Sequence, residues 1–176
     1  DIPVSTDELE FAFNEMREFF EAGDVDFLLL EMMSIPERAV PLYDCVSNST
    51  LPVWCGLSAK RIDYKSKITS FHDELVSFEN NVKTASRYNF DVMGIMHTAV
   101  DLISDCNSII KNHHTGPLMA YPDSGYFQAP NWQFVDIITP QNLLKFAEVW
   151  KTEGMQIIGG CCGLGPEHTS FLSRLK

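Results

Sequence analysis

Short apolar runs alternate with longer stretches of helical periodicity along the whole chain, and this alternation is the strongest constraint on its fold. Residues 25–31 (VDFLLLE) are almost continuously apolar, as a strand buried on both faces must be. Similar strand-like runs cover residues 52–56, 90–96 and 117–121, and a last run starts near Met155 and ends in paired cysteines. Repeated strand–helix units predict an α/β fold with a parallel sheet.

The helical stretches have recognisable ends. Ser5 and Glu8 have the spacing of a capping box, and apolar residues then recur at helical spacing up to position 20. Thr139 and Pro140 open a helix that extends to about residue 152. Further helices are predicted over residues 36–46, 73–87, 99–112 and 166–175. This βα order leaves two architectures, an open doubly wound sheet or part of a barrel.

Polar and metal-binding residue types follow the ends of the predicted strands. In both architectures, ligands bind at the C-terminal ends of parallel strands. The residues that follow these ends are Glu31, Gly56 with Ser58, Met96 with His97, Pro122 with Asp123, and Cys161 with Cys162. Because these ends meet at one rim of the sheet, the sequence predicts a functional site there.

The segment Gly-Gly-Cys-Cys-Gly at 159–163 is the strongest candidate for that site. Glycines allow sharp bends and close backbone approach, and thiolates bind zinc. The chain has five cysteines, an odd number with no disulfide-scaffold spacing, which favours a reducing, cytoplasmic setting. We expect the other three, Cys45, Cys55 and Cys106, to be packing residues.

Composition excludes several classes of function. A formal net charge of −11 argues against nucleic-acid binding, which usually needs a basic patch. No run approaches the roughly 20 apolar residues of a membrane span, and no signal-peptide pattern is present. Since the chain starts at Asp1 without a methionine, we expect it to be part of a longer protein.

Five motifs, in this order, resemble the homocysteine S-methyltransferase family. They are Leu-Leu-Glu at 29–31, Pro-Val-Trp at 52–54, Gly-Ile-Met-His at 94–97, Tyr-Pro-Asp-Ser-Gly at 121–125, and the cysteine motif with Pro166 and His168 downstream. The resemblance implies a (β/α)8 TIM barrel of about 300 residues. Residues 1–176 would form the C-terminal part of that single domain, about strands four to eight with their helices.

The resemblance also implies a metal site. Family members bind zinc through three cysteines, and Cys161 and Cys162 match two of them. The third position is occupied by His97, which implies a Cys2His zinc site with one open position. Met96 and Asp123 stand where the family has asparagines, and Asp123 adds a negative charge near the site. Glu31 matches the family glutamate that contacts the amino group of an amino-acid substrate.

The function implied is zinc-dependent transfer of a methyl group to homocysteine or a related thiol, with a small-molecule thiol and a methyl donor as partners. Zinc would ionise the thiol, which is otherwise mostly protonated at neutral pH. The aromatic residues of the loop at 126–134, including Trp132, are candidates to cover a cationic donor. Two alternatives stay open: a non-catalytic barrel that serves as a binding or structural protein, and another zinc-dependent reaction on a small sulfur compound.

Each candidate residue also has a purely structural interpretation. His97 can be a hydrogen-bonded histidine at the rim, Glu31 a helix cap, and Tyr121 a packing residue, while His72 is expected at the surface. His113 and His114 lie near a predicted helix end, where positive charge is favourable. Five strands also leave a sheet edge open, so we expect the isolated chain to be inactive and to need a partner, with a homo-oligomer as one form of association.

Overall fold

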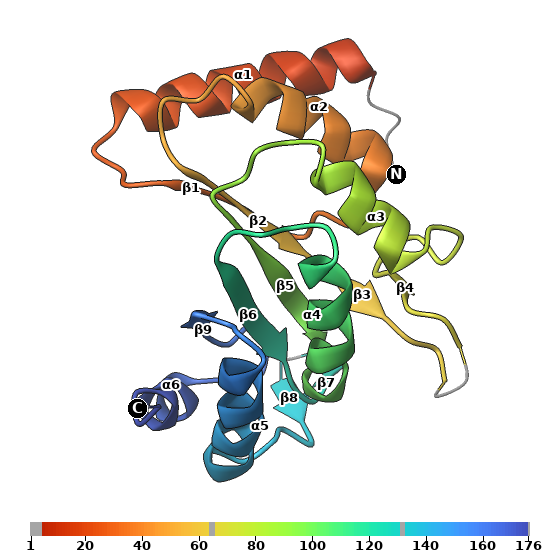
Figure 1. The fold of residues 1–176 in the computed structure, drawn as a ribbon, viewed down its shortest axis with the longest axis vertical. Coiled ribbons are helices and arrows are strands. Elements are labelled where there is room, and N and C mark those ends of the chain that lie inside the picture. The colour runs from red at the N-terminus through yellow and green to blue at the C-terminus, as the bar shows by residue number, and fades with distance from the viewer. Residues whose placement is uncertain (1–4, 64–65, 131–132, 176) are drawn as a thin grey trace.

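The central feature of the computed structural model, which describes residues 5–63, 66–130 and 133–175, is a five-stranded parallel sheet (Figure 1). Its strands, in spatial order, are β1 (Leu28–Leu30), β2 (Val53–Leu57), β5 (Val92–Ala99), β6 (Leu118–Asp123) and β9 (Ile157–Ile158). Along the chain, each strand of this sheet pairs with the sheet strand that came before it, and all pairs are parallel. A doubly wound sheet reverses its order at a switch point. The uninterrupted order is therefore that of consecutive barrel strands, as predicted.

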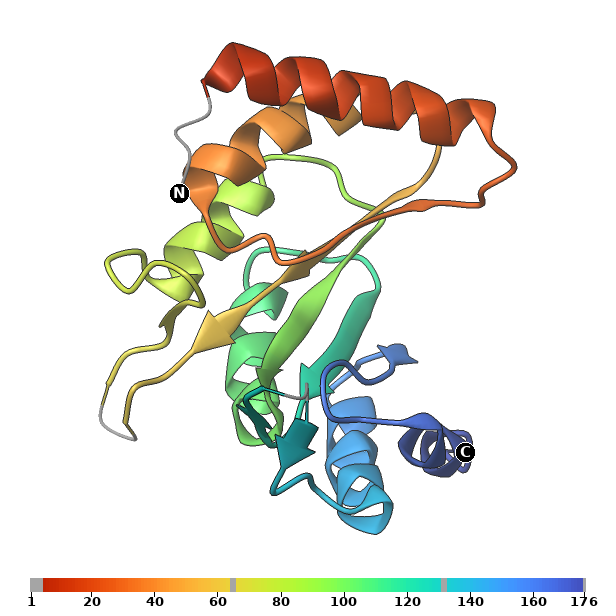
Figure 2. The ribbon, with the colours of Figure 1, turned by 180° about the vertical axis from the view of Figure 1, so that it is seen from behind.

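Helices separate the strands along the chain. They are α1 (Thr6–Ala22), α2 (Pro36–Val46), α3 (Phe78–Ala85), α4 (Ile103–Lys111), α5 (Pro140–Thr152) and α6 (Pro166–Leu172). Figure 1 shows α3 and α4 in front of the sheet, and the view from behind in Figure 2 leaves β2, β5 and β6 uncovered. The helices therefore cover one face of these strands, as in the outer layer of a barrel.

The hydrophobic core lies between the sheet and this helical layer. Alternate strand residues point into it, among them Leu30, Cys55 and Ile95. The helices contribute side chains that are fully buried, including Tyr43, Val82, Ile103, Cys106, Leu143 and Trp150. Cys55 and Cys106 are core residues, and Cys45 is buried as well, so the packing role predicted for these three cysteines is confirmed.

The opposite face of the strands forms the inner surface of the curved sheet. The Phe27 and Trp54 rings stack on it with their centroids 4.0 Å apart. At Gly94 an added Cβ atom would clash with the backbone of Met119 in the neighbouring strand. Strand β6 places Met119 and Tyr121 on this same face, because residues two apart in a strand share a side. The inner surface leads toward the strand ends where ligand-binding residues were expected.

The capping box predicted for the first helix is present. The Glu8 carboxylate accepts a hydrogen bond from the Ser5 backbone N–H at 2.9 Å, and the Glu8 N–H donates to Ser5 Oγ at 3.3 Å.

Helix α2 starts at Pro36 and continues through Pro41, so the second proline does not interrupt it. The helix predicted over residues 36–46 is therefore continuous, with Pro36 in its first turn and Pro41 within it.

Several predicted boundaries were wrong. The helix expected over 73–87 is confined to α3, because the residues before it form turns and Ser77 caps the helix by accepting a hydrogen bond from Asn80. Two short strands precede α3, β3 (Ala59–Lys60) and β4 (Thr69–Ser70), which pair with each other in antiparallel fashion. The helix expected from residue 99 starts as a 3-10 turn, η1 (Val100–Leu102), before α4.

The aromatic segment at 126–134, expected to be a loop, contains regular structure. It contains a hairpin of β7 (Tyr126–Gln128) and β8 (Gln133–Val135). Tyr126 and Phe127 are exposed on it, while Trp132 lies outside the described residues.

Among the helices that the structure describes, none combines the length and apolar character that a membrane crossing needs.

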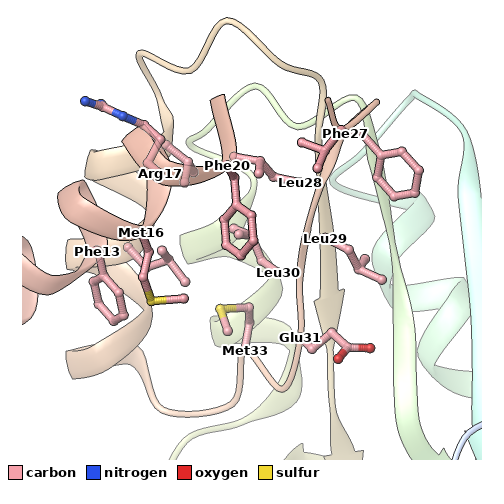
Figure 3. Close-up of a pocket in the computed structure, with 13 residues that line it drawn as sticks. Phe13, Met16, Arg17, Phe20, Phe27, Leu28, Leu29, Leu30, Glu31 and Met33 are labelled. Carbon is pink, nitrogen blue, oxygen red and sulfur yellow. The ribbon is translucent and has the colours of Figure 1, made fainter. Parts of the chain in front are cut away.

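An apolar groove of about 380 Å³ runs between α1 and β1 (Figure 3). Phe13, Met16 and Phe20 line it from the helix, and Leu28 and Leu30 from the strand. Figure 3 shows Leu29 and Glu31 on the other side of the strand, turned away from α1. Within the described residues β1 has a strand partner on one edge only, so this groove marks the open side of the sheet.

Candidate metal centre

His97, Cys161 and Cys162 form a cluster at the C-terminal ends of β5 and β9. One ligand atom from each residue lies within 4.8 Å of the others. The two sulfur atoms are 3.8 Å apart, and Cys161 Sγ is 3.8 Å from His97 Nδ1. In a tetrahedral site with Zn–S bonds of about 2.3 Å, two thiolate sulfurs are separated by about 3.8 Å. The donor types and their spacing therefore fit zinc.

His97 reaches the cluster through a distortion of its strand. The pairing register between β5 and β6 shifts between Met96 and Ala99, and His97 has a φ of 42°, a region that non-glycine residues rarely occupy. The buried Thr98 holds this bulge: its hydroxyl donates to the Met96 carbonyl at 2.8 Å and accepts from the Ala59 N–H at 3.0 Å. Such backbone strain is concentrated at functional sites.

The cysteines are positioned by backbone hydrogen bonds to the end of β6. The Cys161 N–H donates to the Pro122 carbonyl at 2.7 Å, and the Ser124 N–H donates to the Cys162 carbonyl at 3.0 Å. Gly163 follows with a φ of 79°, and an added Cβ atom there would clash with the Ser124 carbonyl. The glycine thus lets the cysteine loop lie directly against β6.

The electrostatic environment favours the protonated form of the Cys161 thiol when no cation is near. Burial is the main cause of the raised pKa of Cys161; a hydrogen bond from the Cys162 backbone lowers this pKa in part, while the Cys162 side chain and the charge of Asp123 raise it. Asp123 Oδ2 lies 3.8 Å from His97 Nδ1. Burial raises the pKa of Asp123, whereas the nearby His97 lowers it. A bound cation would reverse this balance for Cys161 by stabilising its thiolate form.

Glu31 lies at the end of β1 and shares the rim with Tyr121. Burial is the main cause of a raised pKa for Tyr121, followed by the charge of Glu31 and, more weakly, by Cys161. The Tyr121 hydroxyl lies so close to Gly56 that an added Cβ atom there would be 2.7 Å from it. Tyr121 therefore lies near enough to both Glu31 and Cys161 to feel their charges, a proximity that the sequence did not reveal.

A second imidazole lies near the cluster. His72 is exposed, as predicted, but its Nδ1 is 2.6 Å from Ser34 Oγ. The Phe71 ring contacts both imidazoles, with centroid distances of 5.0 Å to His72 and 4.8 Å to His97. No motif marks residues 71–72, and only their position after the second predicted strand, on the connection between β4 and α3, could have indicated this proximity.

A cavity of about 420 Å³ adjoins the cluster at the same rim. Its lining includes Phe71, Asp101 and Asp123, together with Lys60 and Arg61. The two basic side chains are paired outside the cluster: Lys60 with Glu74 at 2.8 Å and Arg61 with Asp105 at 2.7 Å. The cavity is large enough for a small second substrate beside the cluster.

His168, downstream of the cysteine motif, has a structural position. Its Nδ1 accepts a hydrogen bond from the Gly165 N–H at 3.1 Å, and its Nε2 is 2.8 Å from the Ile138 carbonyl oxygen. Nε2 must therefore carry the proton, since a carbonyl oxygen can only accept. This buried histidine joins the start of α6 to the segment before α5.

The fold and site define a barrel-type α/β protein with a thiolate–imidazole cluster at its strand ends. The sequence model of the family described as homocysteine S-methyltransferase matches residues 1–175. The chain therefore belongs to the homocysteine S-methyltransferase family. A search of curated proteins found no match.

Solved structures agree on the fold. The homocysteine methyltransferase MmuM from Escherichia coli, in its apo form, superposes with a TM-score of 0.73 at 16% identity, over 99% of this chain and 59% of that one. The metallated form of the same enzyme gives a TM-score of 0.68 at 19% identity, over 98% and 52%. The chain thus spans little more than half the length of these structures.

Proposed function

We propose that the protein is a zinc-dependent S-methyltransferase that transfers a methyl group to homocysteine or a related thiol. The observation that carries this proposal is the cluster of His97, Cys161 and Cys162, whose sulfur–sulfur distance of 3.8 Å suits a tetrahedral zinc ion. Membership of the homocysteine S-methyltransferase family supports the same reaction. Methylation of homocysteine would produce methionine, which places the reaction in methionine biosynthesis.

In this proposal the three cluster residues hold the zinc ion and leave one coordination position for the thiol substrate. When bound, zinc acts as a Lewis acid that lowers the pKa of the thiol and fixes its sulfur for attack on a methyl group. The chain contributes the site itself, since the bulge at His97 and the hydrogen bonds of Cys161 and Cys162 hold the ligands in place before any metal arrives.

Glu31 and Tyr121 are proposed to recognise the amino-acid part of the thiol. A carboxylate such as that of Glu31 binds an ammonium group through a charge-assisted hydrogen bond. The Tyr121 hydroxyl, close to Glu31 and to Cys161, is proposed to orient the carboxylate or to contact the substrate. The cavity lined by Phe71 and Asp123 would accept the methyl donor.

All five cysteines are free thiols in the structure, which supports our proposal of a reducing, cytoplasmic setting. The runner-up function, a non-catalytic barrel with a binding or structural role, makes a different prediction about activity. It allows the metal but requires that no thiol is methylated.

The decisive experiment measures zinc and methyl transfer in the longer protein of which this chain is proposed to be the C-terminal part, because the isolated chain is expected to be inactive. Elemental analysis is expected to find about one zinc per chain, lost when Cys161 and Cys162 are replaced by serine. Homocysteine with a sulfonium methyl donor is then expected to yield the methylated thiol, and the double serine variant is expected to yield none. Zinc without any transfer, across sulfonium, betaine-type and folate-type donors, would favour the non-catalytic alternative; absence of zinc would refute the proposed mechanism.

A further inference from the structure

The carboxylate of Asp123 lies against the histidine of the cluster. Its Oδ2 is 3.8 Å from His97 Nδ1, and about a quarter of each side chain is exposed. The same nitrogen is 3.8 Å from Cys161 Sγ. Asp123 therefore stands on the side of the imidazole that faces the cysteines, where its charge acts on the space between the three ligand atoms.

The backbone fixes Asp123 relative to the cysteines. Pro122 and Ser124, its two chain neighbours, are hydrogen-bonded to Cys161 and Cys162 at 2.7 Å and 3.0 Å. On its other side, Asp123 is paired with Ala99 in the register that follows the bulge at His97. The carboxylate is thus attached to both halves of the metal site, and its position does not depend on a flexible loop.

The charge of the donor set makes this carboxylate important. Two thiolates and a neutral imidazole balance the charge of a divalent cation but leave no excess negative charge. In the part of the chain that the structure describes, Lys60 and Arg61 are paired with other carboxylates, and Asp123 lies beside His97, which is neutral as a metal ligand. The negative charge of Asp123 is therefore directed at the metal site.

We propose that Asp123 supplies the negative charge that the imidazole of His97, as a neutral ligand, does not bring to the metal site. A carboxylate this close to the ligand atoms attracts a divalent cation, and partial burial makes that attraction stronger than it is in water. This inference rests on the zinc site of the proposed function, and it concerns how the chain holds the metal; the reaction is a separate question.

The test measures zinc affinity by competition with a chromophoric chelator, with no methyl transfer involved. The Asp123→Asn variant of the full chain keeps the shape of the side chain and removes its charge. Its affinity is expected to fall by about tenfold or more, because the variant removes a unit negative charge that lies close to the cation in a partly buried site. Asp101→Asn is the matched control, because Asp101 lines the same cavity and is exposed; its affinity is expected to change less than about twofold.

A double-mutant cycle shows whether the charge of Asp123 compensates for the neutral ligand His97. In a His97→Cys background the ligands bring three thiolates, so the loss of zinc affinity caused by Asp123→Asn is expected to be less than about threefold. An equal loss of affinity in both backgrounds would mean that Asp123 does not compensate for the neutral imidazole, and would overturn the proposal. Should the amide variant not fold, Asp123→Ala provides a second neutral side chain for the same cycle.

The outcomes separate this inference from the proposed function. An unaltered chain that binds no zinc overturns both. Zinc bound equally well by the unaltered chain and by Asp123→Asn overturns the inference alone and leaves the zinc site in place. Weaker zinc binding in the variant, with or without methyl transfer by the unaltered chain, supports the role of Asp123.

Discussion

Gly163 lies against Ser124 so closely that any side chain on the glycine would clash with the serine carbonyl oxygen. The contact keeps the cysteine loop beside β6, and the positive φ of Gly163 is a second reason why only glycine fits well there. The Cys161 and Cys162 sulfurs depend on this contact for their position next to His97.

Gly163→Ala is accordingly expected to destabilise the fold by about 2–4 kcal/mol, because it combines a clash with an unfavourable backbone conformation. Zinc content is expected to fall with it. Gly159→Ala is the matched control in the same motif, since its Cβ atom would lie 3.5 Å from Tyr121 Cβ, an ordinary contact. Urea unfolding and elemental analysis of both variants check this, and equal effects of the two substitutions would contradict it.

The hydroxyl of Thr98 is expected to maintain the bulge at His97. Thr98→Val leaves the buried Ala59 N–H without its acceptor, at a cost of about 1–3 kcal/mol, and is expected to weaken zinc binding. Thr98→Ser keeps the hydroxyl and is expected to keep most of the zinc affinity. The measurement is chelator competition on both variants, and the idea fails if serine and valine behave alike.

Glu31→Gln tests recognition of the substrate amino group. With its negative charge removed, KM for homocysteine is expected to rise by about tenfold or more, while zinc content stays unchanged. A thiol of similar size without an amino group should show no such increase. If KM rises equally for both thiols, Glu31 does not bind the amino group.

The fully buried thiol of Cys55 predicts a loss of stability at alkaline pH. Burial raises the pKa of Cys55 to about 12, above the value of about 8.5 for an exposed thiol. A group whose pKa is raised on folding contributes stability below its unfolded pKa and loses it as pH rises. The free energy of unfolding is therefore expected to be about 2 kcal/mol lower at pH 10 than at pH 8 from this thiol.

Urea unfolding under reducing conditions measures this dependence. Other buried groups, including Cys106 and Tyr43, have raised pKa values as well, so the contribution of Cys55 is taken as the difference from Cys55→Ala. In that variant the free energy of unfolding is expected to depend less on pH, by the amount that the ionisation of one thiol contributes. An unchanged dependence would show that the thiol ionises in the folded state.

The open side of the sheet predicts self-association of the 176-residue chain on its own. Leu29 and Met16, beside the groove between α1 and β1, are 39% and 53% exposed, and an unpaired strand edge invites pairing. Sedimentation at micromolar concentration is expected to show species larger than a monomer. Leu29→Lys is expected to reduce them several-fold, and Leu75→Lys, at a site 96% exposed and outside the groove, is expected not to. A stable monomer of the unaltered chain would contradict this.

Much of the fold could be predicted from the sequence, because an apolar run marks each strand of the central sheet and the helical spacing of apolar residues marks the helices. The runs at 52–56 and 117–121 lie within a few residues of β2 and β6. The failure at residues 73–77 has a physical cause: the segment makes local turns in which Asp73 accepts a hydrogen bond from the Leu75 N–H, and such short polar contacts compete with helix formation.

Only part of the candidate site could be predicted from the sequence. The motifs placed His97, Cys161 and Cys162 at strand ends, and the structure brings these three together. The bulge that turns His97 toward the cysteines has no sequence signature, because it depends on pairing between β5 and β6. The positions of Tyr121 and His72 depend on contacts between residues far apart in the chain, which periodicity does not report.

The chain order of the sheet has a consequence for synthesis. Because every strand of the described sheet pairs with the sheet strand made before it, this sheet can extend strand by strand during translation. The cysteine pair follows the last strand of the described sheet, whereas His97 is synthesised 64 residues earlier. The metal ligands are therefore complete only when the stretch from β5 to β9 has been synthesised and folded, so metal capture would report that this stretch has folded.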